Sequence, residues 1–147
     1  MSEDVIWVKV SGLDELQKKL RDELPKRAKQ ILKDALFAAA QVIKNEMMTL
    51  APRRTGFLAE HIDVKLSARG GELAASAFIG PNGRVMYREQ TGKGKVWIRK
   101  AVTVARWLEF GTSKMAAHPF MTTAFETKKQ GALDVIIGML KTGLGVD

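Results

Sequence analysis

The sequence predicts an α+β domain, in which a small antiparallel sheet packs against a long central helix, with a further C-terminal helix and a long basic loop. Three observations predict this class. Apolar residues recur at three- and four-residue steps after Pro25, two alternating segments flank Gly70 and Gly71, and a second helical pattern begins near Pro119. With 147 residues, the chain suits a single domain over residues 1–147.

The N-terminal segment is expected to form a strand followed by a short helix. Ile6, Val8 and Val10 share one face of the strand, because successive side chains of a strand alternate between faces. Ser11 is a suitable N-cap, and leucines form one stripe of the helix expected from Leu13 to Leu24.

A long helix is expected from about Lys26 to Leu50, as the spine of the fold. Pro25 suits its first turn, and Pro52 stops it. Alanines within its apolar stripe leave room for a close neighbour. The expected stripe consists of Ala28, Ile31, Leu32, Ala35, Ala39, Val42, Ile43 and Met47.

A β-hairpin is expected after this helix. Apolar and polar residues alternate over residues 62–66 and again over residues 73–79, and Gly70 and Gly71 are suited to the turn between them. The Gly-Pro-Asn-Gly sequence of residues 80–83 then ends the second strand.

The stretch from about residue 84 to 100 is expected to be a long mobile loop, because it shows no sustained period. The alternative is a hairpin, either extended, with Val96 and Ile98 in its second arm, or packed on its own domain. Six basic residues and one acid, Glu89, lie beside aromatic residues, a combination typical of an interface with a charged rim. The predicted interface residues are Arg84, Tyr87, Arg88, Lys93, Lys95, Trp97, Arg99 and Lys100.

The C-terminal third is expected to be mostly helical. Residues Val102–Phe110 fit either a short helix or an extended segment. A last helix should begin near Pro119 and run towards Leu144. The tail, about residues 143–147, is expected to fray.

Most aromatic side chains fall on apolar positions and are expected to be structural. These residues are Trp7, Phe37, Phe78, Trp107, Phe110, Phe120 and Phe125. Trp97 is the exception, because it stands among basic residues of the expected loop and is suited to anchor an interface.

The sequence contains no pattern typical of a catalytic or metal site. Cysteine is absent, which excludes disulfides and thiolate metal sites. The two histidines, His61 and His118, lie in different segments, and HExxH, P-loop, GxGxxG and GxSxG patterns are all missing. We therefore expect no catalytic, cofactor-binding or metal-binding residues, no cofactor and no enzymatic activity.

Charge and hydropathy limit the partners. The formal charge of +8 fits a nucleic-acid partner, and equally a soluble surface or an acidic protein partner. Without a recognisable nucleic-acid module, the soluble or protein-binding surface is preferred. No apolar run approaches the roughly 20 residues that span a bilayer, and the N-terminus is acidic, so neither a membrane nor secretion is expected.

Three segments together carry a family resemblance: VSGLDEL at residues 10–16, APRRTGFL at residues 51–58, and WLEFGT at residues 107–112, followed by AHPFM at residues 117–121. In this order they resemble the gene-10-product-like tail-component family of lambdoid long-tailed bacteriophages, also called neck or tail-completion proteins. The resemblance covers most of the chain, but the stretch 84–100 departs from the family pattern in length and basic content.

The resemblance implies a structural virion protein that completes the tail and joins it to the head. It implies an antiparallel sheet with a long helix across it, and a ring of copies, six by the symmetry of long tails, at the head–tail junction. Expected partners are copies of the chain, neighbouring connector and tail proteins, and DNA in the channel, contacted non-specifically. Assembly would take place in the host cytoplasm. The alternative function is a small basic nucleic-acid-binding module.

The family motifs also have physical interpretations, and these are structural. Gly56 permits a sharp change of direction, and Gly111 permits a tight turn. Glu109 stands between apolar neighbours, so we expect it to be partly buried and to need a donor: Arg53, Arg54 or a backbone N–H. The motif residues assigned such roles are Pro52, Thr55, Gly56, Glu109, Phe110, Gly111, Thr112, Pro119 and Phe120.

Overall fold

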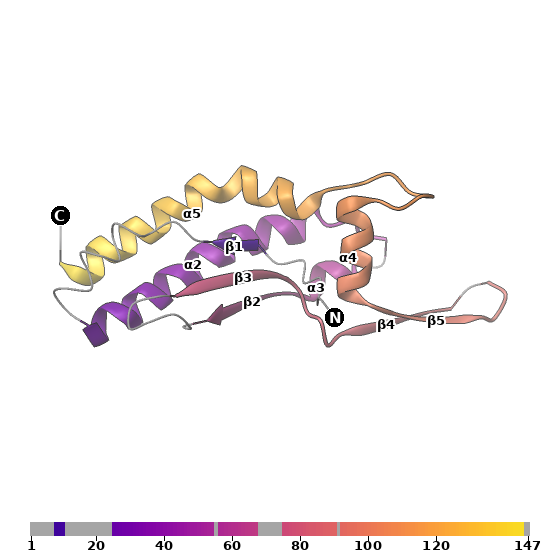
Figure 1. Cartoon of the computed structure of the whole chain (residues 1–147), viewed down its shortest axis with the longest axis horizontal. Coiled ribbons are helices and arrows are strands. Elements are labelled where there is room, and N and C mark those ends of the chain that lie inside the picture. Colours follow the sequence, from indigo (N-terminus) through magenta and orange to yellow (C-terminus); the bar gives the residue numbers. More distant parts are fainter. Residues whose placement is uncertain (1–7, 11–24, 55, 68–74, 91, 146–147) are drawn as a thin grey trace.

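The computed structural model describes residues 8–10, 25–54, 56–67, 75–90 and 92–145. It confirms the α+β class: a small antiparallel sheet lies against a long helix, and a second long helix follows at the C-terminal end (Figure 1). The elements in chain order are β1 (Val8–Val10), α2 (Pro25–Leu50), α3 (Phe57–Glu60), β2 (Ile62–Ser67), β3 (Ser76–Pro81), β4 (Met86–Gln90), β5 (Val96–Lys100), α4 (Ala101–Phe110) and α5 (Phe120–Leu144).

Helix α2 is the spine of the fold, and it begins one residue before the predicted start, at Pro25. Proline is tolerated there because the N–H that it lacks would have no acceptor within the helix. At the other end, the Ala51 N–H donates to the Met47 carbonyl oxygen (2.8 Å) immediately before Pro52, which cannot continue the helix.

The buried face of α2 is wider than the predicted stripe. Leu36 and Ala40 are buried in addition to the predicted positions, whereas Ile31 and Val42 are only partly buried. The face is wide because α2 has neighbours on two sides, the β1–β3–β2 sheet and α5. Its fully buried predicted members are Ala28, Leu32, Ala35, Ala39, Ile43 and Met47.

Helix α5 runs antiparallel to α2 along most of its length (Figure 1). The two helices approach closely at their outer ends. A Cβ atom added at Gly143 would lie 2.7 Å from Cγ2 of Ile31, so a side chain there would require Ile31 or one of the helices to shift. The small residues of both helices therefore allow the close packing that the alanines of α2 predicted.

The three-stranded sheet has the order β1–β3–β2, with both pairs antiparallel. Val64 of β2 is opposite Ile79 of β3, and the side chains of Ile62, Ala77 and Ile79 enter the core beneath α2. The predicted hairpin is therefore confirmed as a strand pair. Leu66, near the far end of β2, is exposed despite its alternating position.

The expectation of a loop over residues 84–100 is wrong for the described residues of this stretch. Strands β4 and β5 form a two-stranded antiparallel hairpin, with Arg88 opposite Ile98, and Val96 and Ile98 lie in the second arm, as the alternative proposed. The hairpin was hard to predict because both of its faces carry charged residues. A two-residue period is visible as apolar alternation only when one face is dry.

The remaining C-terminal expectations are resolved in favour of helix. Residues 101–110 are helical rather than extended, and α5 begins directly after Pro119. The tail does not fray at residue 143: the helix continues through Leu144, and Gly145 (φ 66°, ψ 31°) ends it as a left-handed C-cap. None of the described helices is long and apolar enough to cross a membrane.

Two of the aromatic residues expected to be structural are exposed instead. Phe37 on α2 is 45% exposed, and Phe110 at the end of α4 is 71% exposed, whereas Phe120 is buried. Phe78, Trp107 and Phe125 are partly buried. Five expectations lie outside the described residues: Trp7, the Ser11 cap, the helix of residues 13–24, the role of Thr55 and the turn at Gly70 and Gly71.

Candidate functional site

The candidate site is the end of the molecule at which α4 stands. Two segments project from this end: the β4–β5 hairpin and the connection between α4 and α5, residues 111–119 (Figure 1). Every residue from 112 to 119 is exposed, as are most residues of the hairpin. This end therefore offers contact surface at a distance from the core that α2, α5 and the sheet enclose.

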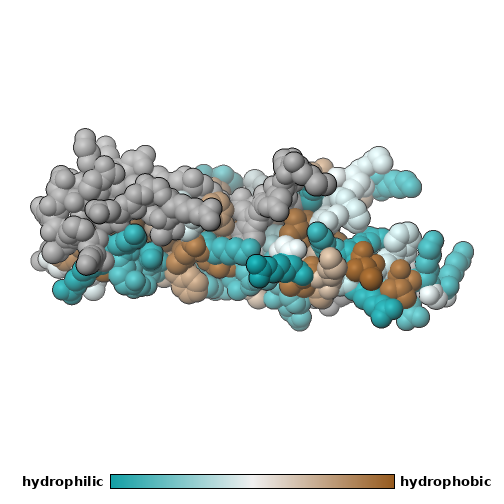
Figure 2. Space-filling model, turned by 60° about the horizontal axis from the view of Figure 1, so that its bottom comes forward, coloured by the Kyte–Doolittle hydropathy of each residue, from teal (hydrophilic) through white to brown (hydrophobic). Residues whose placement is uncertain are grey.

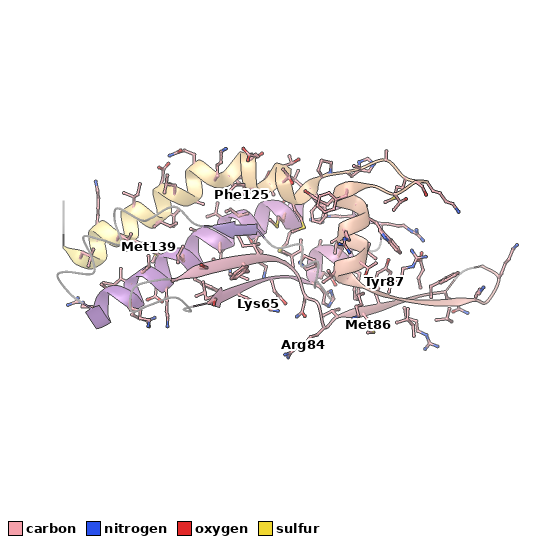
Figure 3. The ribbon with its side chains drawn as sticks, viewed as in Figure 1. Lys65, Arg84, Met86, Tyr87, Phe125 and Met139 are labelled. Carbon is pink, nitrogen blue, oxygen red and sulfur yellow. The ribbon has the colours of Figure 1, made fainter. Side chains whose placement is uncertain are left out.

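The strand register divides the hairpin side chains between two faces. Opposite residues of an antiparallel pair point to the same side, and successive residues point to opposite sides. Tyr87, Glu89, Trp97 and Arg99 form one face, here called the inner face. The other, here called the outer face, consists of Met86, Arg88, Gln90, Val96, Ile98 and Lys100. In Figure 3, Tyr87 accordingly lies on the α4 side of β4 and Met86 on the opposite side.

The inner face attaches the hairpin to the body. Glu89 forms an ion pair with Arg54, from the segment after α2, and the Tyr87 ring lies 4.9 Å from the Phe57 ring of α3. The Arg99 guanidinium lies 5.1 Å from the ring of Trp107 on α4. Arg54 is 82% exposed, so the ion pair contributes at most about 1 kcal/mol, and the aromatic and cation–π contacts carry much of the attachment.

An open cleft of about 280 Å³ lies between the inner face and the body. Its walls are mainly apolar, with Phe57 and Leu58 on one side and Trp107 and Leu108 on the other. Arg54, Glu89 and Arg99 supply its charged side chains, but these already contact one another or the aromatic walls. The cleft is thus part of the contact between the hairpin and the body, rather than a site arranged around a reacting group.

The outer face is exposed and combines apolar with basic side chains. Ile98 is 66% exposed, Met86 is 56% exposed, and Val96 lies beside Ile98 on β5, while Arg88 and Lys100 extend from the same face. Figure 2, which brings this lower side forward, shows apolar residues in brown among hydrophilic residues in teal at the hairpin end. Clustered exposure of this kind is typical of interaction surfaces.

A shallow hollow of about 340 Å³ continues the surface beside β4. It is bordered by Met86 and Arg88 of the strand and by Phe57 and Glu60 of α3. Glu60 places an acidic side chain on the border of the hollow, and Tyr87 and Glu89 of the inner face also line the hollow. The outer face and this hollow thus form one surface across two elements.

The structure splits the predicted interface residues rather than grouping them. Tyr87, Trp97 and Arg99 lie on the inner face, and Arg88 and Lys100 lie on the outer face. Arg84 precedes β4, and Lys93 and Lys95 lie between the strands. Sequence reasoning did not include Met86, Val96 or Ile98 among the predicted interface residues. A strand register would have placed all three on one face with Arg88, but no register follows from this sequence without a recognised turn.

The WLEFGT motif contributes a structural contact that the sequence predicted only in outline. Glu109 is 5% exposed, and its two carboxylate oxygens accept hydrogen bonds from the backbone N–H groups of Met121 and Thr122, each 3.0 Å long. The Thr122 hydroxyl donates to the same carboxylate. The donors are therefore two backbone N–H groups and one hydroxyl group of α5, rather than Arg53 or Arg54.

Glu109 acts as the N-cap side chain of α5, although it belongs to α4. The residue in the N-cap position of α5 is Pro119, whose side chain has no acceptor. Met121 and Thr122 hold the second and third helical positions, whose N–H groups an N-cap side chain normally satisfies. A carboxylate at the helix N-terminus is also favoured by the helix dipole. The motif thus joins α4 to α5.

Gly111 permits the turn between these helices. Its backbone (φ 75°, ψ 176°) lies in a region that is essentially restricted to glycine, and its N–H donates to the Trp107 carbonyl oxygen (2.8 Å). Thr112 and Met115 then pair across a tight turn. Gly56 (φ 74°) similarly permits the change of direction into α3, as predicted.

Within the described ranges, no three metal-binding side chains come together. His61 stacks on Phe57, with ring centroids 4.3 Å apart, and its Nδ1 lies 2.7 Å from the Phe57 carbonyl oxygen. His118 is exposed, and its backbone N–H donates to the Leu108 carbonyl oxygen (2.6 Å). His61 therefore contributes to local structure through its ring, and His118 does so through its backbone.

A family model described as "Bacteriophage HK97-gp10, putative tail-component" matches residues 14–111, about two thirds of the chain. The match extends from before α2 through β4 and β5 to the end of α4. Comparisons with curated proteins and with solved structures gave no match.

Proposed function

The chain belongs to the HK97 gp10-like family of bacteriophage tail components, and from this premise we propose that it completes the tail and joins it to the head. As a phage tail component it is a structural protein of the virion. The finer role is that of one subunit in an oligomeric ring of six copies at the head–tail junction. Sixfold symmetry is what a long phage tail would impose on such a ring.

The observation that carries this proposal is the division of the molecule into a packed body and a projecting contact end. The family motifs form the turns and connections of the body. Gly56 turns the chain into α3, and Glu109 and Gly111 join α4 to α5. The hairpin then presents exposed Met86 and Ile98 outside that body. A protein whose surface is arranged for contact, with motif residues in structural roles, suits assembly rather than turnover.

Ring geometry is compatible with these surfaces. In a closed ring each copy meets the next through two different faces, so the chain needs no self-complementary patch. The α5 side and the sheet side of the body offer such unlike faces, which leaves the hairpin end free to meet another protein. Neighbouring rings above and below would then meet the projecting segments, and DNA passing through the channel would meet basic side chains that face inwards.

The alternative, a nucleic-acid-binding module, has weaker support. It would need basic side chains gathered on one surface, but Arg99 lies against Trp107 on the inner face, whereas Arg88 and Lys100 lie on the outer face among apolar residues. Non-specific contact with channel DNA remains part of the proposed role, as a consequence of charge rather than as the main function.

Deletion of the gene from the phage tests the proposal. We expect infected cells to accumulate filled heads and separate tails, and electron microscopy to show joined particles again when the wild-type gene is supplied from a plasmid. Image averaging of the restored necks should show a ring of this protein. Normal joining without the gene, or localisation of the protein to another part of the tail, would contradict the proposed role.

A further inference from the structure

We infer that the outer face of the β4–β5 hairpin docks onto a different virion protein, at a surface that combines acidic and apolar side chains. This inference rests on the proposed assembly function and specifies the partner of its contact end. It assigns the inner face a different task, which is to hold the hairpin against its own body.

The first step concerns the apolar side chains. Met86 and Ile98 are more than half exposed although they lie in regular strands, and Val96 extends the same face. The hairpin does not need them for its own attachment, because Tyr87, Glu89 and Arg99 provide it from the other face. Three exposed apolar residues on one face of a hairpin lower solubility, so their presence is explained if a partner covers them.

The second step concerns charge. Arg88 is opposite Ile98 and Lys100 is opposite Met86, so basic and apolar groups lie side by side on the same face. Among the described residues, neither Arg88 nor Lys100 takes part in an ion pair shorter than 4 Å. Residues 84–100 contain six basic residues and one acid, and that acid, Glu89, is already paired with Arg54. The complementary surface is therefore acidic.

The third step excludes a second copy as the preferred partner. The whole chain carries a formal charge of +8, so in a second copy the basic outer face would meet a molecule of the same net sign of charge. Most acidic side chains in the described part of the chain already have partners within it. The pairs include Asp34 with Gln30, Glu46 with Lys128, Asp63 with Asn82, Glu126 with Lys129 and Asp134 with Gln130.

The fourth step favours protein over DNA. A DNA backbone is bound by cations and polar groups and would leave Met86, Val96 and Ile98 without a function. Aromatic stacking on bases would need an open ring, but Arg99 lies 5.6 Å and Lys95 5.1 Å from the Trp97 ring. The centre of a protein interface, in contrast, is typically apolar, with a charged rim.

Site-specific photo-crosslinking in the virion tests this assignment. A photoreactive phenylalanine derivative replaces Ile98, and in a separate variant Ile137, an exposed residue of α5, serves as the matched control position. We expect the probe at position 98, and not at 137, to form an adduct with another virion protein, within or next to an acidic segment identified by mass spectrometry. An adduct with a second copy of this chain, an adduct with DNA, or no adduct in intact particles would overturn the inference.

Paired substitutions provide the second measurement. Ile98→Ser and Arg88→Glu should each lower the yield of joined particles about tenfold or more, as expected for central interface residues. Ile137→Ser and Arg27→Glu make the same chemical changes on α5 and α2, and they should leave the yield within about twofold of the wild type. Purified Ile98→Ser and Arg88→Glu proteins should keep the wild-type melting temperature, because both side chains are exposed.

A charge exchange completes the test. Replacement of the crosslinked acidic residue of the partner by arginine should restore joining to the Arg88→Glu variant. Normal joining with Ile98→Ser would overturn the inference. The inference would also be overturned if the charge exchange failed to restore joining and if the loss of joining instead accompanied a loss of binding to a duplex DNA probe at low salt. Failure of the proposed function can be told apart from failure of this inference. If the proposed function is wrong, heads and tails will join normally in the gene deletion, whatever position 98 contacts.

Discussion

At the scale of single residues, backbone geometry and one buried carboxylate decide the connection between α4 and α5. Gly111 has a positive φ, and a Cβ atom at this position would lie 2.9 Å from both the Ala117 nitrogen and the Met115 carbonyl oxygen. Both neighbours are backbone atoms, so neither can rotate away. The turn therefore requires glycine for two independent reasons, conformation and space.

We predict that Gly111→Val lowers the free energy of unfolding by about 3 kcal/mol or more, since conformational strain alone costs about 1–3 kcal/mol. Urea unfolding of the purified variant measures this change. Gly131→Val is a suitable control, because a Cβ atom at Gly131 has open space around it and α5 has ordinary helical geometry there. An unchanged midpoint for Gly111→Val would show that the turn adopts another conformation.

Glu109 gives the second prediction at this scale. Glu109→Ala leaves the Met121 and Thr122 N–H groups without their acceptor, and it should destabilise the protein by about 1–3 kcal/mol. Glu109→Gln keeps one acceptor oxygen and should lose less. Thermal unfolding of both variants measures the order. If alanine is tolerated as well as glutamine, the carboxylate does not cap α5 in solution.

Phe110 illustrates why a motif does not reveal burial. It lies between Glu109 and Gly111 in the family motif, yet it is 71% exposed, whereas Glu109 is almost fully buried. The reason is the helical period. The side chain of Glu109 points towards the α5 N-terminus, and the side chain of Phe110 points about 100° away from that direction.

At the scale of elements, α2 shows how far a period can predict packing. Ala39 is completely buried, whereas Val42, on the same predicted stripe, is only partly buried. The period places a residue on a face, but the neighbours of that face decide how deeply it lies.

We therefore predict different outcomes for two substitutions on α2. Ala39→Asp buries an unpaired carboxylate, at a cost of several kcal/mol that is comparable to the stability of a whole domain, and it should abolish folding. Val42→Asp should give a folded but less stable protein. Circular dichroism and soluble yield distinguish the two. A soluble Ala39→Asp protein with an unchanged melting temperature would mean that this face is open.

The hairpin gives the second prediction for an element. Tyr87→Ala removes the contact with Phe57 and weakens the attachment of the inner face to the body. The amide protons of β4 and β5 should therefore exchange faster, while those of α2 and α5 stay protected. Hydrogen exchange with mass spectrometry measures this difference. Gln90→Ala, on the outer face, is the control. Equal exchange in wild type and Tyr87→Ala would show that other contacts hold the hairpin.

At the scale of the whole molecule, charge is distributed unevenly. The formal charge is +8, and residues 84–100 alone contribute six basic residues and one acid. These charges lie on the segment that projects furthest from the packed body (Figure 1). An acidic partner would therefore meet the most strongly basic part of the molecule first.

We predict that joining depends on ionic strength. Heads and tails from the deletion mutant, mixed with the purified protein, should join several times more slowly at about 0.5 M salt than at about 0.05 M, because the Debye length falls from roughly 14 Å to roughly 4 Å. Counts of joined particles over time measure the rate. A rate that does not change with salt would mean that apolar contact alone drives docking.

Sequence patterns alone predicted the α+β class, the long helix from about residue 26 to 50, the strand pair of β2 and β3, the C-terminal helix and the family. These features follow from local patterns: a sustained period, proline and glycine at helix ends, and motifs in a fixed order. The need of Glu109 for a donor was also readable, because a carboxylate between apolar neighbours must be satisfied.

Only the tertiary structure decided which donor Glu109 finds and which side chains of the hairpin face outwards. The α5 N-terminus reaches Glu109 because Gly111 turns the chain back, a path that no local pattern encodes. The two hairpin faces exist because β4 and β5 pair in one register and because α3 and α4 cover one side. A shift by one residue would have exchanged Ile98 with its inner-face neighbours, so the interface depends on pairing between distant strands rather than on composition.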